Sequence, residues 1–226
     1  MINNINNKYF LNKGIYDNKD IFENTIEAIK ATIKVKLGIY LTVRETKDHI
    51  FVIYEDSNLS RLQNIKDKIG DMTYEDLEYI SFYHIPKLSE VIELINGKID
   101  IIFDLKIKTK NKEIYEMLKN YKGKYLVLGS AKIINEINKN YPFITVGEII
   151  TKKIKFSIYN YFIKSDFRSY DIALFDSIKF KKLKEDGKLI IGYKITNQDL
   201  YNEFKDEFDY LVIDNYQNIK LDKAKI

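Results

Sequence analysis

Short apolar runs of strand-forming residues alternate with amphipathic stretches along almost the whole chain. This alternation predicts repeated βα units, because strands that are separated by helices pair in parallel and are covered by those helices. Eight strands are expected, near Tyr9–Asn12, Ile39–Val43, Ile101–Leu105, Tyr125–Leu128, Ile144–Val146, Ile172–Phe175, Leu189–Tyr193 and Tyr210–Ile213. Eight βα units in a chain of 226 residues predict an α/β fold, a closed (β/α)8 TIM barrel.

Helices are expected between the strands, over Thr25–Ile33, Leu88–Ile95, Glu113–Tyr121, Lys132–Lys139, Phe180–Glu185 and Asp199–Glu207. One segment departs from the repeat. After the second strand, residues 46–49 (TKDH) predict a turn, and the apolar run at 50–54 predicts a β-hairpin return strand that leads back toward the barrel mouth.

Composition limits the protein class. No linker rich in Pro, Gly or Ser divides the chain, so residues 1–226 are expected to form one barrel domain. No stretch is apolar enough to span a membrane, the first residues do not resemble a secretory signal, and there is no cysteine. We therefore expect a cytoplasmic protein. The net charge of +4 is spread along helical segments, and despite a basic run at 151–155 there is no focused stripe for nucleic acid.

In a barrel of this kind, the chemistry lies at the carboxyl ends of the strands. The residues that follow the expected strands are Asn12, Lys13 and Gly14, Tyr40 to Thr42, Glu55 and Asp56, Asp104 to Lys106, Gly129 and Ser130, Asp176, Tyr193 to Asn197, and Asp214.

Several of these segments resemble motifs of the glycerophosphodiester phosphodiesterase family, whose barrel is of the PLC-like phosphodiesterase type. Residues 11–14 (LNKG) stand where the family has HRG, and residues 23–25 match its ENT motif. Residues 39–48 (IYLTVRETKD) follow I-E-x-D-V-R-x-T-K-D, and residues 52–61 (VIYEDSNLSR) follow V-V-x-H-D-x-x-L-x-R. Residues 72–77, 85–91, 103–106 and 212–214 are similar to further family segments, so the resemblance covers nearly the whole chain.

The resemblance implies a phosphoric diester hydrolase of lipid metabolism in which two histidines act as acid and base and three carboxylates hold a divalent metal. In this sequence the histidine positions are Asn12 and Glu55, and the E-x-D positions are Tyr40 and Thr42; only Asp104 keeps a carboxylate. An amide cannot relay protons near neutral pH, and one carboxylate with a phenol and a hydroxyl is a poor site for a hard cation. The usual mechanism is therefore expected to be absent, as in a pseudoenzyme.

What remains could bind an anion. Lys13 and Lys106 match basic positions of the family motifs, and Gly14 keeps the backbone open beside them. The alternative is that Lys106 pairs with Asp104 or Glu55. A separate hypothesis is a relocated, weak Mg²⁺ or Ca²⁺ site built from Glu23, Glu55 and Asp104, with Glu55 as a base. No cofactor is otherwise expected.

Three functions remain open at this point. The first is an inactive family member whose mouth binds a phosphate-bearing small molecule such as glycerol 3-phosphate or a glycerophosphodiester. The second is a divergent, active phosphoric diester hydrolase that uses the relocated carboxylates. The third is a non-catalytic interaction module whose mouth is filled by tyrosine. The sequence does not indicate an oligomeric state.

Overall fold

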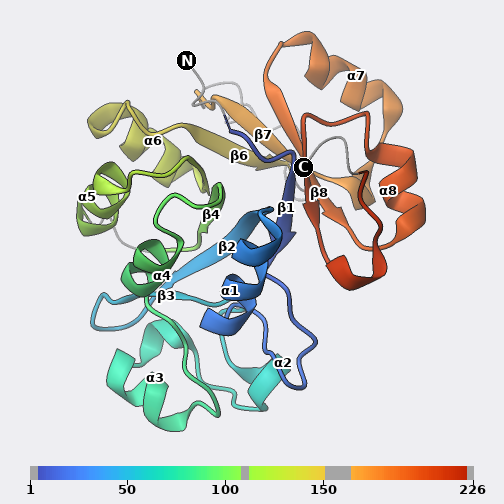
Figure 1. Cartoon of the computed structure of the whole chain (residues 1–226). Helices are drawn as coiled ribbons and strands as arrows, with labels where there is room; N and C mark the ends of the chain where they lie inside the picture. The colour runs from blue at the N-terminus through green and yellow to red at the C-terminus, as the bar shows by residue number, and fades with distance from the viewer. Residues whose placement is uncertain (1–4, 108–111, 151–163, 223–226) are drawn as a thin grey trace.

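A computed structural model describes residues 5–107, 112–150 and 164–222 of the chain. Within these residues, eight parallel strands close into a barrel with helices around it (Figure 1). The strands are β1 (Tyr9–Asn12), β2 (Gly38–Glu45), β4 (Ile101–Leu105), β5 (Tyr125–Gly129), β6 (Val146–Ile150), β7 (Phe167–Asp171), β8 (Leu189–Ile195) and β9 (Tyr210–Ile213). Because β1 pairs with both β9 and β2, the ring is closed, and the expected (β/α)8 barrel is confirmed.

The helices lie outside the ring. They are α1 (Ile26–Val35), α2 (Ser60–Gln63), α3 (Tyr74–Ile80), α4 (Leu88–Ile95), α5 (Lys112–Asn120), α6 (Ala131–Asn140), α7 (Ser177–Glu185) and α8 (Gln198–Phe204). In Figure 1, α5 and α6 cover the left side, α7 and α8 the right, and α2 and α3 lie at the lower end. Thr25 caps α1 by accepting a hydrogen bond from the Ala28 amide, which fixes where this helix leaves the loop after β1.

The barrel interior is filled by side chains from alternate strand positions. A buried cluster contains Phe10, Tyr40, Ile102 and Val212 together with residues of the other strands. Successive strand residues point to opposite faces, so the positions two residues further along the strands, at their carboxyl ends, also face inward. In β1, β2, β4 and β9 these positions are polar, and they are occupied by Asn12, Thr42, Asp104 and Asp214. The apolar core therefore ends in a polar layer at the barrel mouth.

The predicted return strand is present. β3 (Phe51–Ile53) pairs antiparallel with the end of β2 and lies outside the ring. In the turn before it, the Thr46 hydroxyl donates to the Asp48 carboxylate over 2.6 Å, and the Tyr74 amide donates to the same carboxylate over 3.0 Å. The segment that carries α2 and α3 has a small apolar core of its own, which includes Tyr54, Leu59 and Leu77. We call residues 57–85 the insertion.

Two strand predictions were wrong in position. The sequence predicts the sixth barrel strand at Ile172–Phe175, but the structure has this strand, β7, at Phe167–Asp171 and a 3-10 turn at Ile172–Leu174. The polar Arg168 interrupts the apolar run by which a buried strand is recognised in the sequence. Its guanidinium lies on the outer face of the barrel and pairs with Glu148 over 3.2 Å. The fifth barrel strand, predicted at 144–146, is β6 in the structure and runs from Val146 to Ile150. The predicted helices are present, with ends shifted by a few residues, as is usual for boundaries.

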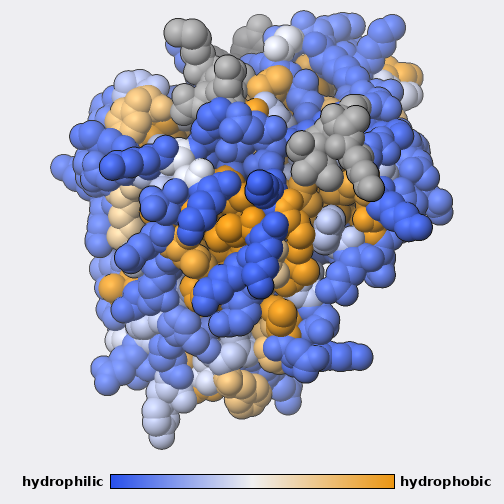
Figure 2. All heavy atoms as spheres, viewed as in Figure 1, coloured by the Kyte–Doolittle hydropathy of each residue, from blue (hydrophilic) through white to orange (hydrophobic). Residues whose placement is uncertain are grey.

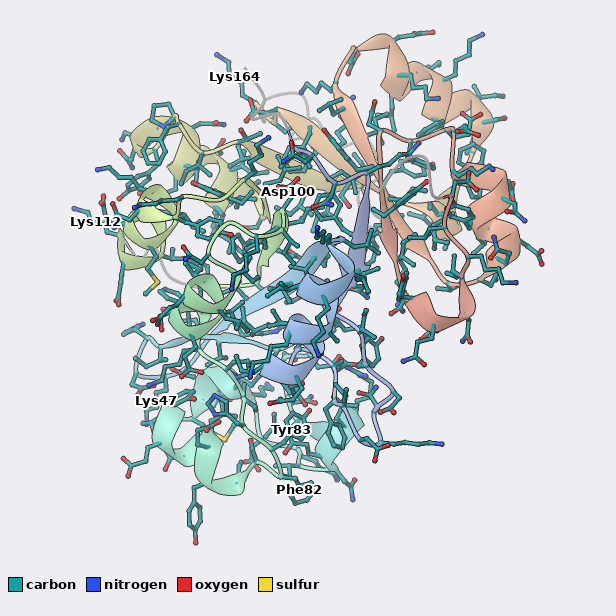
Figure 3. All side chains as sticks on the ribbon, viewed as in Figure 1. Lys47, Phe82, Tyr83, Asp100, Lys112 and Lys164 are labelled. Atoms are coloured by element: carbon teal, nitrogen blue, oxygen red, sulfur yellow. The ribbon has the colours of Figure 1, made fainter. Side chains whose placement is uncertain are left out.

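Figure 2 shows a largely hydrophilic face with apolar residues visible in its middle. Among the residues described, no helix combines the length and apolar character that crossing a bilayer requires. The basic run at 151–155 lies outside the described residues. Figure 3 places Asp100, which precedes β4, far from Phe82 and Tyr83 of the insertion, so the insertion stands at the mouth end of the barrel and Asp100 at the opposite end.

Candidate functional site at the barrel mouth

The inward carboxylate of Asp104 is the centre of one hydrogen-bonded group. Its Oδ2 accepts a hydrogen bond from the Tyr40 hydroxyl over 2.9 Å and lies 3.0 Å from the Lys106 Nζ. Tyr40 is 3% exposed, and burial followed by the charge of Asp104 raises the pKa of this phenol well above its ordinary value. The phenol therefore stays neutral and acts as a hydrogen-bond donor to Asp104. Lys106 is 41% exposed at its side chain and forms the outer, solvent-facing part of the group.

Glu55 forms a second group with β2. Its carboxylate accepts a hydrogen bond from the Thr42 hydroxyl over 2.8 Å, while the Arg44 guanidinium donates to its backbone oxygen. Among the described residues, no cation lies within salt-bridge distance of the Glu55 carboxylate. Burial raises the pKa of Glu55, and this effect outweighs the hydrogen bond from Thr42 and the charge of Lys13, which lower it. Glu55 is thus an acid that holds its proton more tightly than usual.

Lys13 belongs to a third, almost buried group. Its Nζ lies 3.1 Å from Glu23 and 4.0 Å from Asp214. Glu23 also binds Arg61 of the insertion through both guanidinium nitrogens. Burial alone would raise the pKa of Glu23, but the hydrogen bond from Arg61 and the charge of Lys13 outweigh it, so the pKa is lowered. Glu23, the acid of the ENT motif, therefore connects the loop after β1 to the insertion.

Asp214 and Asn12 complete the mouth. Asp214 accepts hydrogen bonds from the Tyr16 hydroxyl over 2.9 Å and from Lys194 over 2.9 Å, and Asn12 donates to it over 3.5 Å. Burial acts against ionisation of Asp214, but Lys194 and Lys13 prevail and lower its pKa. The predicted candidates that the contacts join at the mouth are Asn12, Lys13, Glu23, Tyr40, Thr42, Glu55, Asp104, Lys106 and Asp214. Asp176 instead accepts a hydrogen bond from the Ile178 amide at the start of α7. Sequence reasoning missed the bonding role of Lys194, which directly follows the predicted strand and lies within the longer β8 of the structure.

Gly14 has a packing role. Its φ of +87° is in the left-handed region, and a Cβ on it would lie 2.9 Å from the backbone carbonyl of Ala28 in α1. Only glycine lets the loop after β1 approach α1 this closely. The two histidines lie away from the mouth groups: His49 bonds Glu45, and His84 bonds Glu78 and Glu90.

The residues at the family's metal positions do not fit a divalent cation. Tyr40 supplies a phenol that donates to Asp104, and Thr42 supplies a hydroxyl that donates to Glu55. The Asp104 oxygen that accepts from Tyr40 also pairs with the Lys106 ammonium. Hard cations take several oxygen ligands, mostly carboxylates. Among the described residues, no three His, Asp or Glu side chains are grouped to hold a metal ion. Glu23, the third member of the relocated site, is engaged by Lys13 and Arg61 instead.

Two solved phosphodiesterases have a similar fold. A glycerophosphodiester phosphodiesterase from Thermotoga maritima matches with a TM-score of 0.76 and 20% identity, over 92% of this chain and 94% of the other. A phosphodiesterase from Oleispira antarctica, solved with the product sn-glycerol-3-phosphate, matches with a TM-score of 0.75 and 18% identity, over 92% and 93%.

The sequence itself also matches. A glycerophosphodiester phosphodiesterase from Bacillus altitudinis is 32% identical over 112 residues, and this match spans 45% of either protein. The model of the Glycerophosphoryl diester phosphodiesterase family matches residues 13–143, which include the loop after β1, the insertion and the strands that carry Tyr40 and Asp104. The chain therefore belongs to the glycerophosphoryl diester phosphodiesterase family.

Proposed function

We propose that this protein is a cytoplasmic, single-domain family member that binds a phosphate-bearing glycerol compound at the barrel mouth and does not hydrolyse it. The observation that carries the proposal is the Asp104 group. The one acid kept at the family's metal positions holds the Tyr40 hydroxyl and the Lys106 ammonium. A half-exposed cation at the mouth offers a phosphate charge-assisted hydrogen bonds.

The positions of acid and base support the loss of turnover. Asn12 is an amide, which neither takes nor gives a proton near neutral pH. Of the two residues at the family's histidine positions, only Glu55 can take up or release a proton. Phosphodiester cleavage needs both a base for the attacking hydroxyl and an acid for the leaving oxygen.

Lys13, Lys106 and Gly14 are the proposed ligand-binding residues. Lys13 is 7% exposed and paired with Glu23, so it acts mainly through its charge, whereas Lys106 can turn an ammonium proton to the ligand. The relatives named above suggest the ligand class: sn-glycerol 3-phosphate or a glycerophosphodiester.

The test is an assay of glycerophosphocholine and glycerophosphoethanolamine with Mg²⁺, Ca²⁺ or Mn²⁺, read by ³¹P NMR, with thermal shift for sn-glycerol 3-phosphate beside it. We expect no turnover with any metal and a raised Tm with the phosphate ester. Turnover would contradict the proposal. An unchanged Tm would contradict it too, and would favour an interaction module whose mouth is filled by Tyr40.

A second function, a divergent phosphoric diester hydrolase, is favoured by one observation. Glu55 is half-buried beside Thr42, lacks a cationic partner among the described residues and has a raised pKa, which is how an acid is tuned for proton transfer. If this function is the right one, cleavage is measurable and disappears in both Glu55→Ala and Asp104→Ala. A change in Tm on titration with millimolar Mg²⁺ or Ca²⁺ would support the relocated metal site.

A further inference from the structure

Three large apolar side chains lie exposed on two distant parts of the molecule. Tyr79 is 90% exposed near the end of α3, Phe82 is 77% exposed just after this helix, and Ile178 is 71% exposed near the start of α7. Neighbouring exposed side chains of this size form the kind of apolar patch that marks an interaction surface. In Figure 1, α3 lies at the lower left and α7 at the upper right, so the two surfaces do not meet within one molecule.

The outer face of α3 combines its two rings with negative charge. Glu75 lies one helical turn before Tyr79, and residues four apart share a helix face. Leu77 points the other way, into the apolar core of the insertion. Glu75 is exposed, and among the described residues no basic side chain lies at salt-bridge distance from it. We call the surface formed by Glu75, Tyr79 and Phe82 the α3 face.

The outer face of α7 has the opposite charge. Lys182 lies one turn after Ile178, and both it and Lys181 are exposed, with no carboxylate at salt-bridge distance in the part of the chain that the structure describes. The acids nearby are Glu185, the last residue of α7, and Glu203 on α8. Positive charge is therefore concentrated in the middle of α7, next to the exposed Ile178.

A groove of about 440 Å³ opens beside this helix, between α7 and α8. Its base is aromatic: the ring centre of Phe175, just before α7, lies 5.2 Å from that of Phe180 and 4.8 Å from that of Phe204. Phe180 and Phe204 are buried, whereas Phe175 is half-buried and is the ring that an incoming side chain can reach. On the α8 wall, Glu207 is already paired with Lys184 over 3.0 Å. We call Lys182, Ile178 and the Phe175 end of this groove the α7 face.

The two faces match when one is followed forward and the other backward along the chain. The same separations of four and three positions then recur on both, in Glu75, Tyr79 and Phe82 and in Lys182, Ile178 and Phe175. Antiparallel packing of α3 on α7 therefore sets the carboxylate against the ammonium and brings Phe82 to the Phe175 end of the groove. Opposite charges at one end of the contact favour this register over others.

We propose that the α3 face of one molecule binds the α7 face of a second copy of the chain. Because each molecule carries both faces, at distant places, the contact is heterologous. It joins copies head to tail, into a closed ring or an open filament. This inference is independent of the ligand that the barrel mouth takes.

The experiment is sedimentation velocity of the full chain at rising protein concentration. We expect association that is clear at low salt and weakens at about 1 M NaCl, where the Debye length is only about 3 Å. Two variants each remove one face: Tyr79→Ser with Phe82→Ser, and Ile178→Ser with Lys182→Glu. Each should associate at least about tenfold more weakly than the wild type, because apolar side chains no longer leave water at the contact.

Mixing the two variants tests the head-to-tail arrangement. One keeps only the α7 face and the other only the α3 face, so an equimolar mixture should form a heterodimer and nothing larger. The heterodimer also shows that both variants are folded. Phe143→Ser is the matched control, since Phe143 is 47% exposed and lies after α6, outside both faces. It should associate as the wild type does.

A charge exchange tests the register. Glu75→Lys alone and Lys182→Glu alone should each weaken association by about threefold or more, the scale of an exposed ion pair. The two changes in one chain should restore it, because every contact again joins opposite charges. A double variant as weak as the single ones would overturn the antiparallel register.

Other results would overturn the contact itself. They are association that persists in either face variant, and a mixture of the two variants that stays monomeric. A wild type that is monomeric at every concentration in low salt would also overturn it. If that monomer sediments with phosphatidylcholine vesicles and the Tyr79→Ser, Phe82→Ser variant does not, the two rings serve a lipid surface instead.

Discussion

The residues of this chain that match the family motifs have mostly structural roles, while those that differ occupy the chemical positions. Thr46 and Asp48 hold the turn before β3, and Glu23 anchors the insertion through Arg61. By contrast, Tyr40 stands at a metal position and is now a hydrogen-bond donor to Asp104. The residues that match the motifs thus make contacts that support the fold.

Tyr40→Phe tests the Asp104 group. Removing the hydroxyl deletes a hydrogen bond to a buried carboxylate, so we expect a loss of about 1.5–3 kcal/mol in the free energy of unfolding. Urea denaturation followed by circular dichroism measures it. Tyr79→Phe is the control, because Tyr79 is 90% exposed and should change stability little. If the two variants were equally stable, the Tyr40 hydroxyl would not be an important partner of Asp104.

At the scale of elements, the insertion is held to the barrel by contacts at both of its ends. Near its start, Arg61 binds Glu23 in the loop after β1. Near its end, His84 lies between Glu78 of α3 and Glu90 of α4, at 2.6 and 2.8 Å. These contacts fix the position of α2 and α3 beside the mouth, and with it the charge that surrounds Lys13.

Arg61→Ala should destabilise the protein by about 1–3 kcal/mol, because the 1% exposed Glu23 carboxylate keeps only Lys13 as a cationic partner. Thermal and urea unfolding measure the loss. Lys119→Ala, which removes an exposed pair with Glu116, is the control and should stay within about 0.5 kcal/mol. Adding Glu23→Gln to Arg61→Ala should recover part of the loss; a purely additive double variant would contradict the pairing.

His84 gives the insertion a pH dependence. Both ring nitrogens meet carboxylate oxygens, which only accept, so the geometry fits the imidazolium. Burial alone would lower the pKa of His84, but the hydrogen bonds to Glu78 and Glu90 raise it above 6.5. The stabilisation is therefore complete below pH 6.5 and is lost as the pH rises through the folded-state pKa.

Because His84 is 47% exposed, solvent screening limits the effect to about 1 kcal/mol or less. Urea unfolding of the wild type and of His84→Gln across pH 5–9 measures it. The difference between them should be largest at acidic pH and shrink toward alkaline pH. A difference independent of pH would show that His84 acts through packing instead of charge.

For the whole molecule, the barrel positions its strand ends independently of the residues that stand there. Eight closed parallel strands fix Asn12, Tyr40, Asp104 and their neighbours at one mouth, whichever side chains they carry. The side chains at the strand ends can therefore differ while the fold stays the same, and the TM-scores of 0.76 and 0.75 are found at only 20% and 18% sequence identity.

A back-substituted chain tests this separation. Asn12→His, Tyr40→Glu, Thr42→Asp and Glu55→His together restore the family pattern around Asp104. We expect millimolar Ca²⁺ to raise the Tm of this variant, by mass action, and to leave the wild-type Tm unchanged. Differential scanning fluorimetry with and without EDTA checks it. If the variant is folded and its Tm is the same with and without Ca²⁺, metal binding at the mouth requires more than these four side chains.

The sequence by itself determined the barrel, the return strand and the residues that meet at the mouth, because buried parallel strands and motif spacing are local patterns. It failed at β7, where a polar residue, Arg168, finds its partner Glu148 only after the strands pair. It left open whether Lys106 binds a ligand or Asp104, and whether Glu23 joins Glu55 and Asp104. Only the tertiary structure decided these pairings, with Lys106 on Asp104 and Glu23 on Lys13 and Arg61. The physical reason is that an ion pair depends on which side chains the closed ring and the insertion bring within a few ångströms, and that distance is not encoded in any one segment.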